Sequence, residues 1–246
     1  MNPCVLVPIF NHDDTILGVL GSLADLKLPC LVVDDGSDAA TRHALARAVH
    51  EYPWVTVERL PDNRGRGAAL RHGYRAAWAQ GYSHVVQLDA DGQHEAGDVS
   101  RFLEAARQRP ETLVLGAPVF DASAPRRRLI GRRISRFWVH VETRSRVIND
   151  PLCGFRCFPL GPTVDLLSRV RFGDRMEFDP EIAVRWVWEG WPIVNLPTRV
   201  KYFRGGRSHF RPLEDNIRIS WAHTRLVFGM LWRLVGGGLV LRRCPR

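Results

Sequence analysis

Short apolar runs alternate with amphipathic segments along the first half of the chain. After the first run, apolar residues recur at helical spacing from Ile16 to Leu23. The same patterns predict strands over residues 4–10, 28–34, 55–60, 84–89 and 112–115, and helices over 16–24, 41–52, 68–79 and 99–107. Because continuously apolar strands separated by helices are typical of a parallel sheet covered on both faces, the predicted fold class is α/β, with a mostly parallel sheet flanked by helices.

Polar clusters follow four of the predicted strands. Asn11 comes after the first strand, and Asp34 and Asp35 end the second. Residues 63–67 follow the third strand, and residues 89–94 follow the fourth. Ligands of parallel sheets bind at the carboxyl ends of the strands. The four clusters are therefore expected to meet at one nucleotide-sized site.

The D-x-D triplet Asp89-Ala90-Asp91 suggests a metal site at the end of the fourth strand. Hard ions such as Mg²⁺ or Mn²⁺ take oxygen ligands and share them with phosphates. Gln93 and His94 would add neutral ligands or partners of the ligands. Taken alone, the triplet would favour a strand end capped by an Asx turn. Its position among the other polar clusters favours the metal.

The second half of the chain is less regular. Its predicted elements are helices over 132–147 and 180–188, a loop entering a strand over 150–158, a short strand over 193–196 and a basic loop over 204–211. No repeat or clear linker is visible, so residues 1–212 are expected to form one domain with a C-terminal helical extension over 213–246.

The C-terminal extension contains an apolar stretch, residues 226–241, interrupted by Arg233. The stretch falls short of the roughly 18 uncharged residues that a spanning helix needs. Arg225 and Arg233 would also be costly at a bilayer centre. A basic amphipathic helix at the membrane interface is one expectation, and a core or dimer-contact helix is the other.

The 246-residue chain carries a formal charge of +9, and its lysines are only Lys27 and Lys201. Residues 126–146 hold eight arginines and one acid, Glu142. This excess of positive charge would favour binding to nucleic acid, to an anionic membrane surface or to a phosphorylated substrate. Because no nucleic-acid-binding motif is present, nucleic acid is the disfavoured partner.

Five cysteines at uneven spacing argue against a disulfide framework and favour reduced, mostly buried thiols. The N-terminus also lacks the basic and apolar regions of a signal peptide. The expected location is therefore cytoplasmic, peripheral at the inner face of the membrane.

Several motifs occur in an order that resembles family 2 glycosyltransferases, especially those similar to dolichyl-phosphate or polyprenyl-phosphate mannosyl- and glucosyltransferases. The motifs are Val7-Pro8 with Asn11, Val33-Asp34-Asp35-Gly36-Ser37, Asn63-Arg64-Gly65-Arg66-Gly67-Ala68 and Asp89-Ala90-Asp91-Gly92-Gln93-His94. Residues 150–156 resemble the D-x-x-x-G-F-R element of that subgroup, and the whole resemblance covers about residues 3–210. It implies a GT-A (Rossmann-like) fold, a nucleotide-sugar donor and inversion at the anomeric carbon.

The resemblance also implies roles for the donor-side residues. Pro8, Asn11 and Asp35, with Asp34 beside them, would contact the nucleotide. Asp89, Asp91 and Gln93 would bind the metal and the diphosphate, and Arg207 would belong to a C-terminal loop that closes over the phosphates. His12 stands where the family often has Glu. Backbone amides of the Asn63–Gly67 loop, around Gly65 and Gly67, could approach a phosphate or ribose closely because glycine lacks a Cβ.

The resemblance also implies that the phosphate of the acceptor is bound by Arg156, Arg132 and Arg133 with Ser135. The subgroup often carries Ser-Arg after the fifth strand, where this chain has Ala117-Pro118. A lipid phosphate is already ionised, whereas a hydroxyl acceptor needs a base, for which the candidates are Asp150 and then Glu177 and Asp179. The expected catalytic residues are Asp150, Arg156 and Asp91.

The predicted function is a metal-dependent, membrane-associated, inverting glycosyltransferase. It would move a hexose from a nucleotide-diphospho-sugar to a lipidic or polyprenyl-phosphate acceptor. One alternative is transfer to a hydroxyl of a non-phosphorylated lipid or glycan. A nucleotidyltransferase is a second alternative. Such enzymes usually have a glycine- and arginine-rich loop after the first strand, whereas this chain has Asn11-His12-Asp13-Asp14 there, which disfavours this alternative. A non-catalytic binder of anionic membranes is a further alternative.

Overall fold

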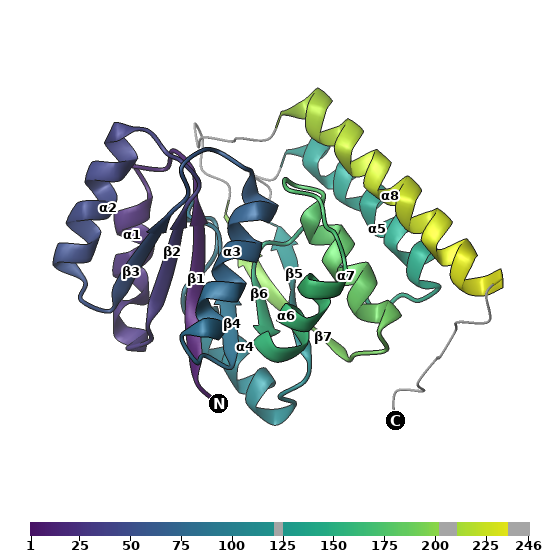
Figure 1. Cartoon of the computed structure of the whole chain (residues 1–246), viewed down its shortest axis with the longest axis horizontal. Helices are drawn as coiled ribbons and strands as arrows, with labels where there is room; N and C mark the ends of the chain where they lie inside the picture. Colours follow the sequence, from purple (N-terminus) through teal and green to yellow (C-terminus); the bar gives the residue numbers. More distant parts are fainter. Residues whose placement is uncertain (121–124, 202–210, 236–246) are drawn as a thin grey trace.

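The computed structural model describes residues 1–120, 125–201 and 211–235. Its seven-stranded sheet has the order β3-β2-β1-β4-β6-β5-β7 (Figure 1). The strands are β1 (Pro3–Ile9), β2 (Cys30–Asp34), β3 (Val55–Arg59), β4 (His84–Gln87), β5 (Leu113–Phe120), β6 (Arg156–Pro159) and β7 (Ile193–Val200). Only β6 is antiparallel to its neighbours, β4 and β5; the other pairs are parallel.

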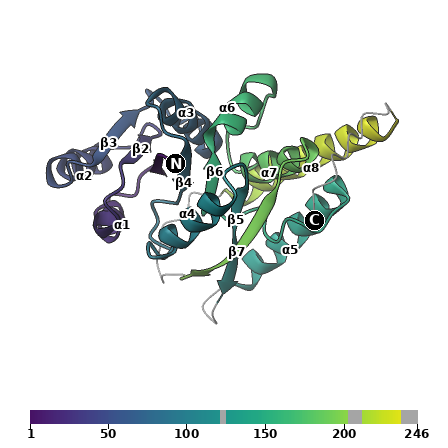
Figure 2. The same ribbon diagram turned by 90° about the horizontal axis from the view of Figure 1, so that it is seen from below.

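Helices cover both faces of the sheet, as Figure 2 shows in a view from below. They are α1 (Ile16–Leu23), the short 3-10 helix η1 (Ala24–Leu26), α2 (Ala39–Glu51), α3 (Arg66–Ala79), α4 (Asp98–Gln108), α5 (Arg126–Thr143), α6 (Leu160–Arg169), α7 (Phe178–Trp188) and α8 (Pro212–Val235). One face packs against α3, α6 and α7, and the other packs against α1, α2 and α4. The long helices α5 and α8 pack against each other and against α7.

Successive residues of β1 enter two different hydrophobic clusters. Leu6 belongs to the cluster beneath α3, α6 and α7, whereas Val5 and Val7 belong to the cluster beneath α1, α2 and α4. Side chains alternate between the faces of a strand, so a strand that is buried on both faces must be apolar throughout. This burial explains the continuous apolar runs of the sequence.

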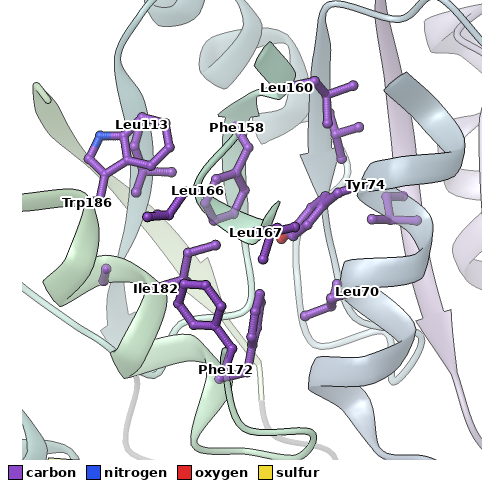
Figure 3. Close-up of a cluster of buried hydrophobic side chains, with 14 of the residues drawn as sticks. Leu70, Tyr74, Leu113, Phe158, Leu160, Leu166, Leu167, Phe172, Ile182 and Trp186 are labelled. Atoms are coloured by element: carbon purple, nitrogen blue, oxygen red, sulfur yellow. The ribbon is translucent and has the colours of Figure 1, made fainter. Parts of the chain in front are cut away.

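Aromatic side chains join the sheet to the helices on the α3, α6 and α7 face (Figure 3). Phe158 of β6 lies 5.1 Å from Tyr74 and 6.1 Å from Trp186, measured between ring centroids. All three side chains are fully buried. The Tyr74 hydroxyl donates a hydrogen bond to the Gln87 side chain, so its polar atom is satisfied inside the core.

The order of strands and helices predicted for the first half is confirmed. The fifth strand is longer than predicted because β5 pairs with β7 along its whole length, from Leu113 to Phe120. Helix α6 was not predicted, since Gly161 and Pro162 stand at its start. Proline is tolerated there because the first turn of a helix has no partner for the missing N–H.

Helix α8 is amphipathic along the part that the structure describes. Ala222 and Leu226 are buried, whereas Trp221, Phe228 and Trp232 are exposed. No helix in the described ranges combines the length and the apolar character needed to cross a bilayer. The predicted helical extension over 213–246 is helical as far as Val235, and residues 236–246 lie outside the described residues.

The four described cysteines are buried and unpaired, as predicted, and Cys244 lies outside the described residues.

We expect Phe158→Ala to lower the free energy of unfolding by about 3–5 kcal/mol, because the substitution leaves a cavity between buried rings. Urea denaturation would measure the loss. Val49→Ala, at a 44% exposed position of α2, is the control and should change stability by less than about 0.5 kcal/mol. A small effect of Phe158→Ala would show that β6 does not anchor this face of the core.

Candidate active site

A cavity of about 1230 Å³ lies at the carboxyl ends of the parallel strands. Strands β2 and β3 lie on one side of β1 and β4 lies on the other, so the chain order reverses next to this cavity. Crevices at such reversal points are the usual ligand sites of α/β sheets. The lining includes Asp179 of the candidate bases and these residues predicted for the donor side: Pro8, Asp35, Asn63, Gly65, Asp89, Asp91 and Gln93.

Asp35 fixes the loop that follows β3. Its two carboxylate oxygens accept hydrogen bonds from the backbone N–H groups of Arg64 and Gly65, both at 2.8 Å. Burial raises the pKa of Asp35, although these two hydrogen bonds oppose the rise. Arg175 donates to the Asn63 side chain at 3.3 Å from the other side of the loop. Asp35 and Arg175 therefore hold the loop at the edge of the cavity from two sides.

Asn11 and Asp34 are turned toward the start of α2 and are not part of the cavity lining. Asn11 has a positive φ of 53°, and its side chain accepts from the Asp38 N–H at 2.8 Å. Asp34 is 1% exposed, accepts from the Ser37 N–H at 2.9 Å and pairs with Arg59. Both residues shape the β2–α2 turn in this structure.

The glycines of the loop face protein rather than open space. A Cβ on Gly65 would lie 2.6 Å from the Asp174 carbonyl oxygen, and one on Gly67 would lie 2.6 Å from the Phe178 Cβ. Gly65 also has a φ of 105°, which side chains with a Cβ rarely adopt. Packing against residues 173–178 and, at Gly65, the backbone conformation both require glycine here.

Arg66 links Asp89 to the start of α7. Its Nε and Nη2 donate to Asp89 Oδ1 at 3.1 and 2.7 Å, and its Nη1 pairs with Asp179. Burial opposes ionisation of Asp89, but Arg66 and His94 outweigh it and hold the pKa of this carboxyl below its ordinary value. A Cβ on Gly154 would lie 2.1 Å from Asp89 Oδ2, so the backbone packs directly on the carboxylate.

Asp91 differs from Asp89 in its electrostatic surroundings. Burial, and then the negative charge of Asp89, raise the pKa of Asp91. Its Oδ1 accepts from the Gln93 N–H at 3.0 Å. A carboxylate whose ionisation is opposed by a like charge is a place where added positive charge is favourable.

The donor set at this edge fits a hard cation that also binds a phosphate. Within the described ranges, no three His, Cys, Asp or Glu side chains are grouped to hold a metal. Mg²⁺, however, is usually held by one or two carboxylates together with phosphates of the substrate. Asp89 and Asp91 would be those carboxylates, and Gln93 lines the cavity with them.

Two expected catalytic residues, Asp150 and Arg156, are not part of the cavity lining. Asp150 accepts from Arg132 at 2.7 and 2.8 Å with its two oxygens, and from the Leu152 N–H at 2.8 Å. Arg156 is fully buried and donates to the carbonyl oxygens of Cys153, Asp179 and Pro151. The Arg156 guanidinium therefore holds the loop over 150–156 by hydrogen bonds within the protein. It does not line the cavity in which an acceptor substrate would bind.

The opposite wall of the cavity is formed by α5 and α8. Arg132 and Ser135 of α5 line it, whereas Arg133 is exposed outside the lining. Several apolar residues line the same wall and remain more than a third exposed: Ile130, Ile134, Trp138 and Phe228. Arg207 lies outside the described residues.

The structure adds residues that the sequence patterns did not single out. Arg66 directly follows Gly65 and begins α3. Its partner Asp179 is 113 positions away, so no local pattern joins them. His223 and Glu142, which meet beside the cavity, are 81 positions apart.

Comparison with known proteins agrees with this geometry. Residues 4–160 match the family model described as Glycosyl transferase family 2. Polyprenol monophosphomannose synthase of Mycolicibacterium smegmatis is 31% identical over 207 residues, which cover 78% of this chain and 75% of that protein. Undecaprenyl-phosphate mannosyltransferase of Micrococcus luteus is 33% identical over 119 residues, 48% of each chain.

Among solved structures, glucosyl-3-phosphoglycerate synthase from Mycobacterium tuberculosis superposes with a TM-score of 0.63 at 19% identity. The match covers 94% of this chain and 79% of that chain, and it shows a shared fold.

We expect Gly65→Ala to lower the free energy of unfolding by at least about 2 kcal/mol, because the new Cβ would meet a backbone carbonyl at a strained φ. Gly97→Ala is the matched control, since a Cβ there has nothing within 4 Å. Urea midpoints of the two variants would be compared. Equal midpoints would mean that residues 173–178 do not press on this loop.

Proposed function

Because this chain belongs to glycosyl transferase family 2 and has its GT-A fold, we propose that it moves a hexose from a nucleotide-diphospho-sugar to a polyprenyl phosphate. One observation carries the proposal. A single cavity joins the carboxylate edge of the sheet to the arginine-bearing wall of α5. Pockets for single small ligands measure about 300–1,000 Å³. A cavity of about 1230 Å³ therefore suits a donor and an acceptor head group together.

The donor would lie on the sheet side of the cavity. Pro8, Asp35 and the loop at Asn63 and Gly65 would contact the nucleotide, and Asp89, Asp91 and Gln93 would hold Mg²⁺ or Mn²⁺. Bound there, the cation would neutralise negative charge on the diphosphate. Arg66 keeps Asp89 ionised and in place by pairing with it.

The acceptor would lie on the α5 side. Arg132 lines the cavity on this side, and guanidinium groups match phosphate geometry. An acceptor phosphate oxygen would attack the anomeric carbon from the face opposite the nucleoside diphosphate. The new C–O bond forms as the bond to the diphosphate oxygen breaks, and the configuration inverts.

A phosphate acceptor needs no base, which suits the surroundings of the candidate bases. Asp150 is bound to Arg132, and Asp179 is bound to Arg66. Both carboxylates already accept hydrogen bonds from guanidinium groups. These contacts favour a phosphate acceptor over a hydroxyl acceptor.

The apolar rim of the cavity supports contact with a membrane, where a polyprenyl lipid resides. Ile134 of α5 and Phe228 of α8 line the cavity, yet they are 54% and 67% exposed. Arg127 and Arg128 line the same region. Apolar residues beside arginines are typical of helices that lie at an anionic interface. We propose that α5 and α8 together contact the bilayer (Figure 1).

The purified protein is expected to transfer hexose from a UDP-, GDP- or dTDP-sugar to polyprenyl phosphate, measured with labelled sugar and extraction of the lipid product. Asp91→Asn should lower the rate at least about a hundredfold, because a metal ligand is lost. Asp165→Asn, at an exposed carboxylate of α6, is the control and should keep full activity.

Transfer to polyprenol but not to polyprenyl phosphate would refute the phosphate acceptor. Full activity with EDTA present, or in Asp91→Asn, would refute the metal assignment.

We expect Ile134→Glu with Phe228→Glu to weaken binding to vesicles of phosphatidylglycerol and phosphatidylcholine at least about tenfold, because two apolar contacts with the interface are lost. Vesicle sedimentation would measure the change. Trp78→Glu is the control, at a 48% exposed apolar residue of α3. Equal loss in the control variant, or no loss in the double variant, would rule out this face as the membrane contact.

A further inference from the structure

A buried polar cluster lies where α5 and α8 pack together. His223 Nδ1 is 2.7 Å from Glu142 Oε1, and His223 Nε2 is 3.4 Å from Ser135 Oγ. The exposed fractions are 5% for His223, 1% for Glu142 and 5% for Ser135. Ser135 and His223 both line the cavity, on the wall that carries Arg132.

Glu142 determines which way the imidazole ring faces. Its Oε2 has no hydrogen-bond partner among the described residues, so its hydrogen bond to His223 Nδ1 is its main polar contact. Burial raises the pKa of Glu142, and the hydrogen bond with His223 opposes the rise. One proton is therefore held between Glu142 and Nδ1. The other ring nitrogen, Nε2, is left facing Ser135.

The protonation of Nε2 decides what the Ser135 hydroxyl offers to the cavity. Without a proton, Nε2 accepts the Ser135 O–H, and only oxygen lone pairs face a ligand. With a proton, Nε2 donates to Ser135 Oγ, and the Ser135 O–H is free to donate. A phosphate oxygen needs a donor, so it matches only the second arrangement.

We propose that His223 is a positioning residue that turns the Ser135 hydroxyl toward an anionic acceptor and takes up a proton as that acceptor binds. This role rests on the proposed transfer to a lipid phosphate. The proton neutralises the net negative charge of the His223–Glu142 pair, so an acceptor phosphate favours its uptake by charge as well as by hydrogen bonding.

Several other charged groups on the packed helices have partners of their own. Arg132, one turn before Ser135 on α5, pairs with Asp150. On α7, Glu181 pairs with Arg225 of α8, and the Arg185 guanidinium lies over the Phe172 and Trp188 rings. Glu142 is therefore the charged group that His223 contacts directly.

Calorimetry with farnesyl phosphate, a short isoprenyl monophosphate, tests this role. Titrations in buffers of different ionisation enthalpy give the number of protons taken up on binding. We expect the wild type to take up more protons than His223→Gln, whose side-chain amide is a fixed donor at the Nε2 position. Because binding takes up a proton, wild-type affinity should fall about tenfold as the pH rises, whereas the affinity of His223→Gln should stay flat.

Ser135→Ala provides a second variant, should His223→Gln fail to fold. It should bind farnesyl phosphate about tenfold more weakly, through loss of one hydrogen bond to a charged group, and lose the extra proton uptake. His140→Gln is the matched control. His140 lies on α5, as Ser135 does, but its Nε2 contacts the Ile148 carbonyl oxygen. The control should behave as the wild type does.

The outcomes separate the two proposals. No binding of farnesyl phosphate by the wild type would refute the lipid-phosphate acceptor, and the role of His223 with it. Binding with equal proton uptake in the wild type and His223→Gln would refute the role of His223 alone. Unchanged proton uptake in Ser135→Ala would do the same.

Discussion

A largely enclosed guanidinium, that of Arg66, holds the candidate active site together. It pairs with Asp89 at the end of β4 and with Asp179 at the start of α7. Arg156 in turn donates a hydrogen bond to the Asp179 carbonyl oxygen. Removing one member of such a network would leave an unpaired buried charge, which is strongly destabilising. The sheet edge, the first turn of α3 and the first turn of α7 are therefore fixed relative to one another.

This pairing gives the two carboxylates of the D-x-D triplet different properties. Asp89 already has a cation beside it, and its pKa is lowered. The pKa of Asp91 is raised by burial and by the charge of Asp89. Of the two, Asp91 gains more from an added positive charge. Two acids one residue apart thus have different electrostatic surroundings, because only Asp89 pairs with Arg66.

The sequence predicted the layered α/β fold and the gathering of Asp35, Asp89 and Asp91 at one cavity, because strand periodicity and position along the chain determine both. It could not predict orientation: Asp34, beside Asp35, points the other way and pairs with Arg59. Nor could it predict pairs such as Arg66 and Asp179, since only the tertiary fold brings distant residues together. The antiparallel direction of β6 depends likewise on long-range pairing.

Strand β6 affects how the sheet can be completed during synthesis. It lies between β4 and β5, two strands that precede it along the chain, and pairs with both. Until residues 156–159 leave the ribosome, those strands have no partner between them and expose open edges. Open edges can pair with other chains, which leads to aggregation. A nascent chain that ends before β6 therefore presents the open edge of β4, which the complete sheet covers.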